Sequence, residues 1–286
     1  MFSFGVNYRF LILSLLAYFL MNVLFAARLK RVLNEVGYDI RFSELLMAQY
    51  GGMLASDFTP ARAGYLVAAA ILNPFVPVSV GASAILFIQS FEFLVKVCGA
   101  FLGIFFLASL LEENVLSISL MGIGVMLVGA IVILYGLRSG GIASLLGKVS
   151  FTRRFVGMVA AARDACKQLG LKVVAEVVLF TLICWVVKGT EWWLIGQALG
   201  IAQVTLLGFF LIHPLVTALS FVPLTPSGMG FQDGATVGVL YLLGVPIAQG
   251  VLFALLARFL LVLEDLVGLY PISKIGFQAV GRFLTT

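Results

Sequence analysis

The stretch Thr59-Pro60-Ala61-Arg62-Ala63-Gly64-Tyr65 interrupts a hydrophobic segment, and its pattern returns at Thr225-Pro226-Ser227-Gly228-Met229-Gly230-Phe231, 166 positions later. Both stretches read threonine, proline, a small residue, two further residues, glycine and an aromatic residue. Proline lacks the N–H that a helix interior needs but suits the first helical turn, and threonine is a good N-cap. We therefore expect one helix to end near Ser56 and new helices to begin near Pro60 and Pro226.

The segments around these breaks are strongly hydrophobic. Hydrophobic residues make up 62% of the 286 positions and charged residues 11%, whereas a soluble domain is about half apolar and a quarter charged. Crossing a hydrocarbon core of roughly 30 Å takes about 20 apolar residues. Five segments are that long: Tyr8–Ala27, Val80–Leu107, Val115–Leu137, Val173–Leu199 and Ile247–Tyr270. We expect an all-α, polytopic membrane helical bundle that forms a single integral membrane domain over residues 1–286.

Lysine and arginine gather in two places, and they orient the chain because cytoplasmic loops carry an excess of both. One group follows the first span, and the other fills the segment after Val115–Leu137. The groups are Arg28, Lys30, Arg31 and Arg41, and Arg138, Lys148, Arg153, Arg154, Arg163, Lys167 and Lys172. We therefore expect a multi-pass protein of the cell (plasma) membrane, with its N-terminus outside and its C-terminus cytoplasmic.

Two interrupted stretches must then return to the side on which they start. Phe42–Leu72 begins and ends in the cytoplasm and is broken at Asp57–Gly64; Val204–Gly244 begins and ends outside and is broken at Pro223–Gly230. Irregular backbone at membrane depth is tolerated only against protein or a wet cavity, so we expect two re-entrant hairpins of broken helices. Val204–Val222 is long enough to cross alone, and that alternative stays open.

The charge-based topology and the repeated motif together predict an inverted repeat. Its first half covers about residues 8–108, a connector about 109–170, and its second half about 171–270. The same offset of 166 carries Glu92 in the helix after the first break onto Arg258 in the helix after the second.

The breaks are candidate binding sites for an anion. Helix N-termini offer unpaired N–H groups and a positive dipole end, and arginine adds a fork of donors suited to phosphate. Alternatively, Arg62 reaches the cytoplasmic surface or pairs with Asp57, and the glycines serve helix packing. The candidate substrate-binding residues are Thr59, Pro60, Arg62, Gly64, Thr225, Pro226, Ser227, Gly228 and Gly230.

Ionisable residues inside the hydrophobic segments are costly there and mark partners or aqueous paths. They are Asp57, Glu92, Lys96, Lys188, Glu191, Asp233, Arg258, Glu264 and Asp265. Helical spacing puts Glu92 with Lys96, Lys188 with Glu191, and Arg258 with Asp265 on shared faces. Either these pairs neutralise each other, or Glu92 and Arg258 line a polar cavity. Asp233 has three candidate partners: a cationic part of the substrate, a proton, or Arg62.

Other chemistry has little support in the sequence. No nucleophile–base pair, phosphate loop, dinucleotide fingerprint or metal-ligand cluster is found, and the three cysteines suggest neither disulfides nor a metal site. We expect no enzyme activity, no metal and no cofactor. His213 is interpreted as a packing residue. The basic excess fits cytoplasmic loops and anionic lipids rather than nucleic acid.

The second break resembles a family signature. Pro226–Asp233, followed by Leu243-Gly244-Val245, resembles the P-x-G-x-G-x-x-E motif of the lysylphosphatidylglycerol synthase transmembrane family, also called flippase-like or YbhN-type. Pro60–Gly64 resembles the family's P-x-R-x-G element and Arg28–Gly37 its basic stretch. The resemblance covers roughly residues 8–270. Asp233 stands where the family more commonly has glutamate, and Tyr65 stands where an acidic residue often follows the glycine of the motif. The headgroup preference of this chain therefore stays open.

The resemblance implies lipid translocation. Relatives move aminoacylated phosphatidylglycerol between leaflets, and others are linked to glycolipids or isoprenoid-linked sugars. No segment matches the soluble aminoacyl-transferase domain of some relatives, so we expect a transporter rather than a synthase. The hypothesis is a lipid flippase or scramblase whose partners are anionic or phosphate-bearing membrane lipids, driven by a gradient, the membrane potential, or a proton through Asp233 or Glu92. The alternatives are a secondary transporter of a small anion and a non-transporting membrane scaffold for a lipid-modifying enzyme.

Overall fold

The computed structural model describes residues 6–59, 62–111, 117, 120, 124, 169–218 and 225–275, and every regular element within them is helical. The prediction of an all-α chain is therefore confirmed for this part. The elements are α1 (Tyr8–Glu35), α2 (Phe42–Asp57), η1 (Ala63–Leu66), α3 (Val67–Ile71), α4 (Val78–Leu107), η2 (Ala108–Leu110), α8 (Leu171–Ala198), α9 (Leu206–Ala218), α10 (Phe231–Leu242), α11 (Ile247–Asp265), η5 (Leu266–Gly268) and α12 (Leu269–Ile275). The predicted span Val115–Leu137 and the predicted connector lie almost wholly outside the described residues. Pro60 also lies outside them.

Four predicted spans correspond to observed helices, namely α1, α4, α8 and α11. α1 and the helix from Val78 to Leu110 are long and apolar enough to cross a membrane, judged by length and composition. α1 continues beyond the predicted end at Ala27 to Glu35. The continuation follows from its arginines, lysine and leucines, which are good helix formers.

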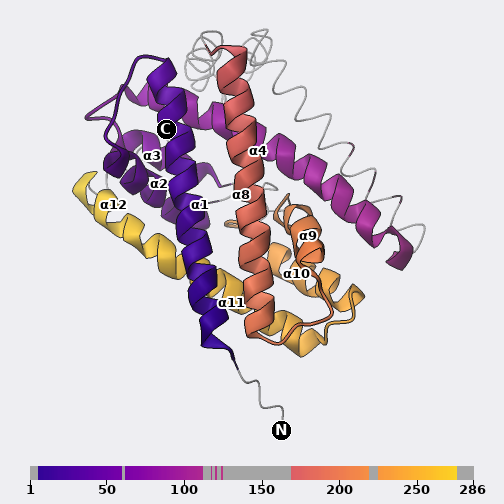
Figure 1. The fold of residues 1–286 in the computed structure, drawn as a ribbon. Helices are drawn as coiled ribbons and strands as arrows, with labels where there is room; N and C mark the ends of the chain where they lie inside the picture. Colours follow the sequence, from indigo (N-terminus) through magenta and orange to yellow (C-terminus); the bar gives the residue numbers. More distant parts are fainter. Residues whose placement is uncertain are drawn as a thin grey trace.

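α1 and α8 lie side by side and run in opposite directions (Figure 1). The N–H of Asn7 donates to the carbonyl of Ala198 over 3.0 Å, so the start of α1 meets the end of α8. At the other end of the pair, Arg31 of α1 forms an ion pair with Glu176 of α8. The segment 36–41, which leads into α2, and the segment 199–205, which leads into α9, therefore lie at opposite ends of the pair.

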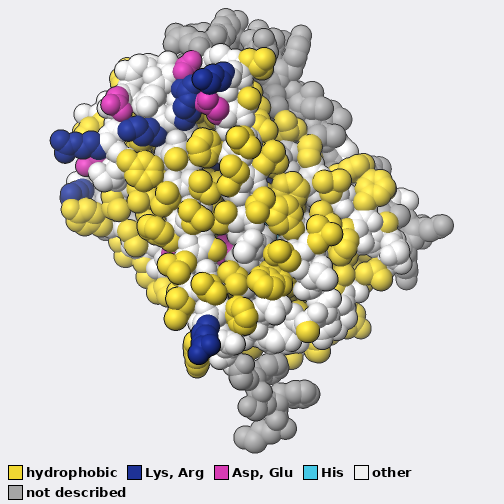
Figure 2. All heavy atoms as spheres, in the orientation of Figure 1, with side chains coloured by type: hydrophobic (Ala, Val, Ile, Leu, Met, Phe, Trp, Pro, Cys, Tyr) yellow, Lys and Arg dark blue, Asp and Glu magenta, His cyan; other side chains and the backbone are white. Residues whose placement is uncertain are grey.

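The outer face built by α1 and α8 is hydrophobic. Large apolar side chains of α1 are widely exposed, among them Ile12 at 59% and Leu16 at 58%. In Figure 2, hydrophobic side chains cover the middle of this face, whereas charged ones gather near the end where α1 finishes. This distribution suits a helix pair that faces lipid.

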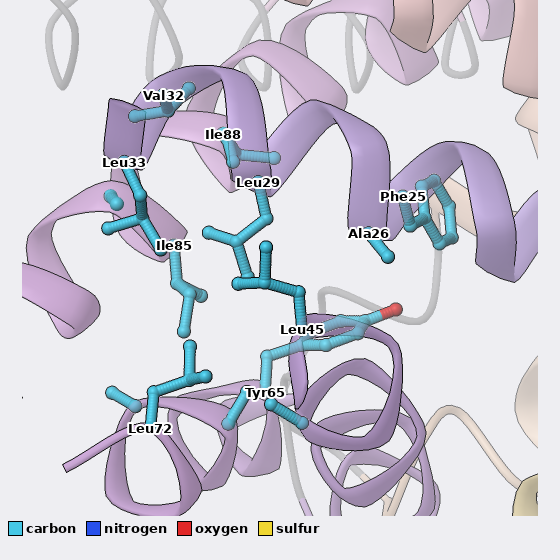
Figure 3. Packing of buried hydrophobic residues seen from close by; sticks show 14 of the residues in the cluster. Phe25, Ala26, Leu29, Val32, Leu33, Leu45, Tyr65, Leu72, Ile85 and Ile88 are labelled. Carbon is cyan, nitrogen blue, oxygen red and sulfur yellow. The ribbon is translucent and has the colours of Figure 1, made fainter. Parts of the chain in front are cut away.

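Two kinds of packing hold the bundle together. Leu29 and Leu33 of α1 meet Leu45 of α2 and Ile85 of α4 in a hydrophobic cluster (Figure 3). Elsewhere on α4, a glycine permits a close approach to α9: a Cβ added at Gly103 would lie 2.5 Å from the carbonyl oxygen of Leu211. Small residues at such contacts are typical of membrane helix pairs.

The first break has the expected helix end. α2 ends at Asp57, next to the predicted Ser56, and the Thr59 hydroxyl accepts a hydrogen bond from the N–H of Gly64 over 2.7 Å. Arg62 adopts a left-handed backbone conformation with φ 57°, which is strained for a residue with a side chain. Helical structure resumes at Ala63.

The prediction that a helix begins near Pro226 is wrong. α10 begins at Phe231 because three of the intervening residues, Ser227, Gly228 and Gly230, have positive φ and form a turn instead of a helical turn. This turn touches the first break: the N–H of Ser227 donates to the carbonyl of Thr59 over 3.1 Å. The two interruptions therefore meet inside the bundle.

Candidate functional site

A cavity lies where the two halves of the chain meet. Its empty space, counted together with the part that is open to the surroundings, is about 1010 Å³. Residues of α1, α2, α4, α8, α9, α10 and α11 line it together with the first break. Among the described residues, four cationic and two acidic side chains line this space, so positive charge is in excess. They are Arg62, Glu92, Lys96, Lys188, Asp233 and Arg258.

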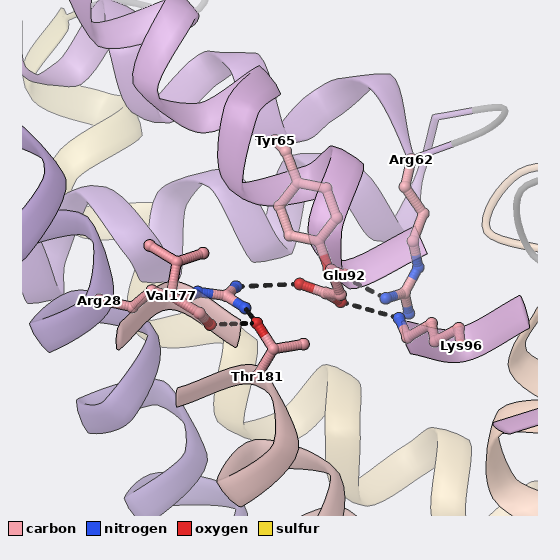
Figure 4. A network of polar contacts seen from close by, with 7 residues as sticks. All are labelled: Arg28, Arg62, Tyr65, Glu92, Lys96, Val177 and Thr181. Atoms are coloured by element: carbon pink, nitrogen blue, oxygen red, sulfur yellow. Dashed lines mark hydrogen bonds and ion pairs between the residues drawn. The ribbon is translucent and has the colours of Figure 1, made fainter. Parts of the chain in front are cut away.

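Glu92 is the centre of one charged network (Figure 4). Its Oε2 accepts a hydrogen bond from Nη2 of Arg28 over 2.9 Å, and its Oε1 accepts one from Nζ of Lys96 over 2.8 Å. Nη1 of Arg28 also donates to the hydroxyl of Thr181 over 2.8 Å. The network joins α1, α4 and α8, and it places two cations around one carboxylate.

Arg28 is a residue that the sequence reasoning misplaced. The charge pattern predicts a cytoplasmic position for it together with Lys30, Arg31 and Arg41, but it is 2% exposed and faces the bundle interior. A signal existed: Met21, Phe25 and Arg28 are spaced four and three positions apart, and all three are buried. Helical spacing therefore puts Arg28 on the inward face of α1.

Arg62 also points into the cavity, beside Lys96 (Figure 4). Its Nη1 donates to the hydroxyl of Tyr65 over 2.9 Å. Its Nε is buried and has no hydrogen-bond partner among the described residues, and no ion pair of Arg62 is found there. In this structure the partner of Arg62 is thus Tyr65, rather than Asp57.

Asp233 pairs with a side chain that is not among its three predicted partners. Its Oδ1 accepts hydrogen bonds from Arg258, over 2.9 Å from Nε and 2.8 Å from Nη2. Its Oδ2 accepts one from the N–H of Gly230 over 2.9 Å, which caps α10. Asp233 therefore pairs with Arg258, not with Arg62, and the positive end of α10 already faces a carboxylate.

A second group of charges lies beside the cavity. Nζ of Lys188 is 2.6 Å from a carboxylate oxygen of Glu191, and it sits over the ring of Tyr18 at 4.4 Å from the centroid. The hydroxyl of Tyr18 donates to Asp265 over 2.8 Å. Asp57 lies next to Asp265, and both acids are buried, at 2% and 0% exposed.

Arg258 and Asp265 do not form the neutralising pair that their helical spacing predicts. Arg258 pairs with Asp233, and Asp265 accepts a hydrogen bond from Tyr18. Glu264 is partly buried and lies outside the residues that line the cavity. His213 lines the cavity and packs edge-on against Trp192, with ring centroids 4.7 Å apart.

The remaining predicted site residues belong to the turns at the breaks. The hydroxyls of Thr225 and Ser227 are buried without a hydrogen-bond partner among the described residues. Gly64 packs against the backbone of Ala55 so closely that a side chain would clash. Gly228 has φ 71°.

One comparison with known proteins gives a match. The family model described as Lysylphosphatidylglycerol synthase TM region matches residues 4–264, a range that includes both breaks and the six charged lining residues named above. No curated protein matches the chain, and no solved structure does.

Proposed function

Because this chain belongs to the lysylphosphatidylglycerol synthase transmembrane family, a family of membrane proteins, we propose that it is a flippase or scramblase that moves a phosphate-bearing lipid between leaflets. The observation that carries the proposal is Arg62: its guanidinium lines a cavity with excess positive charge, its Nε has no hydrogen-bond partner, and it forms no ion pair among the described residues. A guanidinium fork fits phosphate oxygens with two parallel hydrogen bonds.

The interrupted helices supply the route in this proposal. α2 has 16 residues, which gives a length of about 24 Å at 1.5 Å per residue. This is shorter than the roughly 30 Å hydrocarbon core; the described part of α9 is Leu206–Ala218. We take α2 and α9 as the first arms of two re-entrant hairpins that enter from opposite faces, with the cavity where their breaks meet.

An inverted repeat accounts for several equivalences between the halves. α1 and α8 each have 28 residues, and each precedes a short helix, a break and a second short helix. Arg62 and Gly228 are 166 positions apart, and both have left-handed backbones, with φ 57° and 71°. Rocking of one half against the other would open the cavity to each face in turn. The acyl or isoprenoid tails stay in the surrounding lipid, and the C-terminus is cytoplasmic.

The test uses the purified chain in liposomes that contain a fluorescent phosphatidylglycerol. Arg62→Ala removes a charge-assisted contact worth about 1.5–3 kcal/mol, so flipping should slow at least about tenfold, while Arg62→Lys should retain part of the rate. Arg41→Ala is the matched control, because Arg41 is exposed at the start of α2.

Two outcomes would contradict the proposal. Flipping that is insensitive to Arg62→Ala would show that the headgroup does not bind there. In a second arm, the same liposomes are placed in a solution of inorganic phosphate, and its uptake reports soluble transport. Phosphate uptake without lipid movement would favour a small-anion transporter, for which the cationic lining is also suited.

A further inference from the structure

Both carboxylates that line the cavity in the described part of the chain are engaged by the protein's own cations. Glu92 lies between Arg28 and Lys96, at 2.9 and 2.8 Å. Asp233 is held by Arg258 at 2.8 Å and by the N–H of Gly230. An ammonium group that entered the cavity would have to displace a cation to reach either acid.

Some of the aromatic rings that line the cavity are already occupied. Ammonium ligands also bind over aromatic faces, but three of the lining rings already carry a protein cation. Arg28 lies 4.7 Å from the centroid of Phe25, Lys188 4.4 Å from that of Tyr18, and Arg62 5.8 Å from that of Tyr65.

The acids nearest to the cavity are shielded from it. Asp57 and Asp265 are nearly fully buried, and the Tyr18 hydroxyl covers one oxygen of Asp265. Glu191 has a side chain that is 3% exposed and pairs with Lys188. Among the described residues, none of these three lines the cavity.

We propose that the cavity selects phosphate-bearing lipids whose headgroup carries no ammonium group, an inference that rests on the proposed function. Arg62 binds the phosphate. The rest of the headgroup is absent, or is an uncharged polyol or sugar. An aminoacylated headgroup adds a cation to a space that already holds an excess of cations, and it finds no carboxylate among the described lining residues that is free of a protein cation. Selectivity then arises from like-charge repulsion as well as from the phosphate contact.

The experiment compares three lipids with the same fluorescent acyl chain in liposomes that contain the full chain. They are phosphatidylglycerol, phosphatidylethanolamine and lysyl-phosphatidylglycerol, with headgroup charges of −1, 0 and +1 by their chemistry. Dithionite quenching measures the rate at which each lipid reaches the outer leaflet. We expect phosphatidylglycerol to move at least about tenfold faster than the lysyl derivative, the ratio that corresponds to about 1.4 kcal/mol.

A charge-removal variant ties this preference to the ion pairs. Arg258→Gln leaves the Asp233 carboxylate with the N–H of Gly230 and exposes it to an ammonium group, so the ratio should fall several-fold. Arg258→Lys keeps the charge and should keep the ratio. Lys96→Gln repeats the test at Glu92, which retains Arg28, in case the first variant does not fold.

The outcomes separate the two proposals. Equal rates for the three lipids, or faster movement of the lysyl derivative, would overturn the selectivity and leave a flippase. An unchanged ratio in both folded charge-removal variants would also overturn it. Movement of none of the lipids would refute the proposed function, and the selectivity with it.

Discussion

Asp57 and Asp265 differ from Glu92, Glu191 and Asp233 because they lie next to each other and neither forms an ion pair among the described residues. Ionised carboxyl groups only accept hydrogen bonds, and two of them in contact repel unless a proton lies between them. Both oxygens of Asp57 and one of Asp265 have no donor among the described residues. By contrast, Glu92 and Asp233 each have basic partners.

The variant Asp57→Asn should therefore stabilise the protein. The new amide would donate to the unpaired oxygen of Asp265, and the like-charge repulsion would disappear. A hydrogen bond of this kind contributes about 1 kcal/mol, so we expect the unfolding temperature in detergent to rise by about 2–4 °C.

Asp233→Asn is the matched control for this prediction. It removes the charge that faces Arg258 and should lower the unfolding temperature, since a partly buried cation loses its partner. A fall of equal size in Asp57→Asn would show that the contact between Asp57 and Asp265 is stabilising as it stands.

At the scale of helices, the sequence predicted the long elements well and the broken ones less well. Hydrophobic length is a strong signal, and it identified α1, α4, α8 and α11 within a few residues, apart from the ends of α1 and α11. The predicted start of α10 was wrong because the turn before this helix depends on three positive φ angles. The residue types of the motif do not specify these angles. Pro226 correctly indicated that the helix is interrupted. The glycines with positive φ set the length of the interruption.

The close contact between α4 and α9 gives a prediction at this scale. Gly103→Ala would place a Cβ 2.5 Å from the carbonyl oxygen of Leu211, so the helices must separate. We expect a loss of about 1–3 kcal/mol in the free energy of unfolding, measured by chemical denaturation in detergent, together with slower lipid flipping.

Gly238→Ala serves as the control for the packing argument, because a Cβ there meets nothing within 4 Å. Alanine in an open helical position should stabilise by up to about 1 kcal/mol. If both variants were equally unstable, the effect would come from the helix backbone and not from the contact between α4 and α9.

At the scale of the whole molecule, the positions of lysine and arginine predicted on which side of the membrane each segment starts. They could not predict which segments contact each other. The hydrogen bond from Ser227 to Thr59 and the shared cavity depend on how two distant segments fold together. The same limit explains Arg28. Its charge suggested a loop, whereas its helical position brings it to Glu92, 64 residues further along the chain.

The arrangement of the two hairpins can be tested by labelling from one side. Cys98, Cys166 and Cys184 are first replaced by serine. Single cysteines are then introduced as Asp39→Cys, in the segment before α2, and as Gln203→Cys, in the segment before α9. Both positions are exposed, and they lie at opposite ends of the α1–α8 pair. An impermeant maleimide should label Gln203→Cys fully in intact cells, but Asp39→Cys only after permeabilisation.

Each pattern of labelling bears on a separate part of the mechanism. Labelling of both positions from the same side would mean that the segments before α2 and α9 share a face, and opposed hairpins would then be impossible. Opposite labelling with the sides exchanged would overturn only the orientation, because the cavity needs the two hairpins to oppose each other and does not depend on which one is cytoplasmic. The proposed cavity therefore requires that the two positions are labelled from opposite sides of the membrane. The direction of transport depends on which of the two positions is labelled from outside the cell.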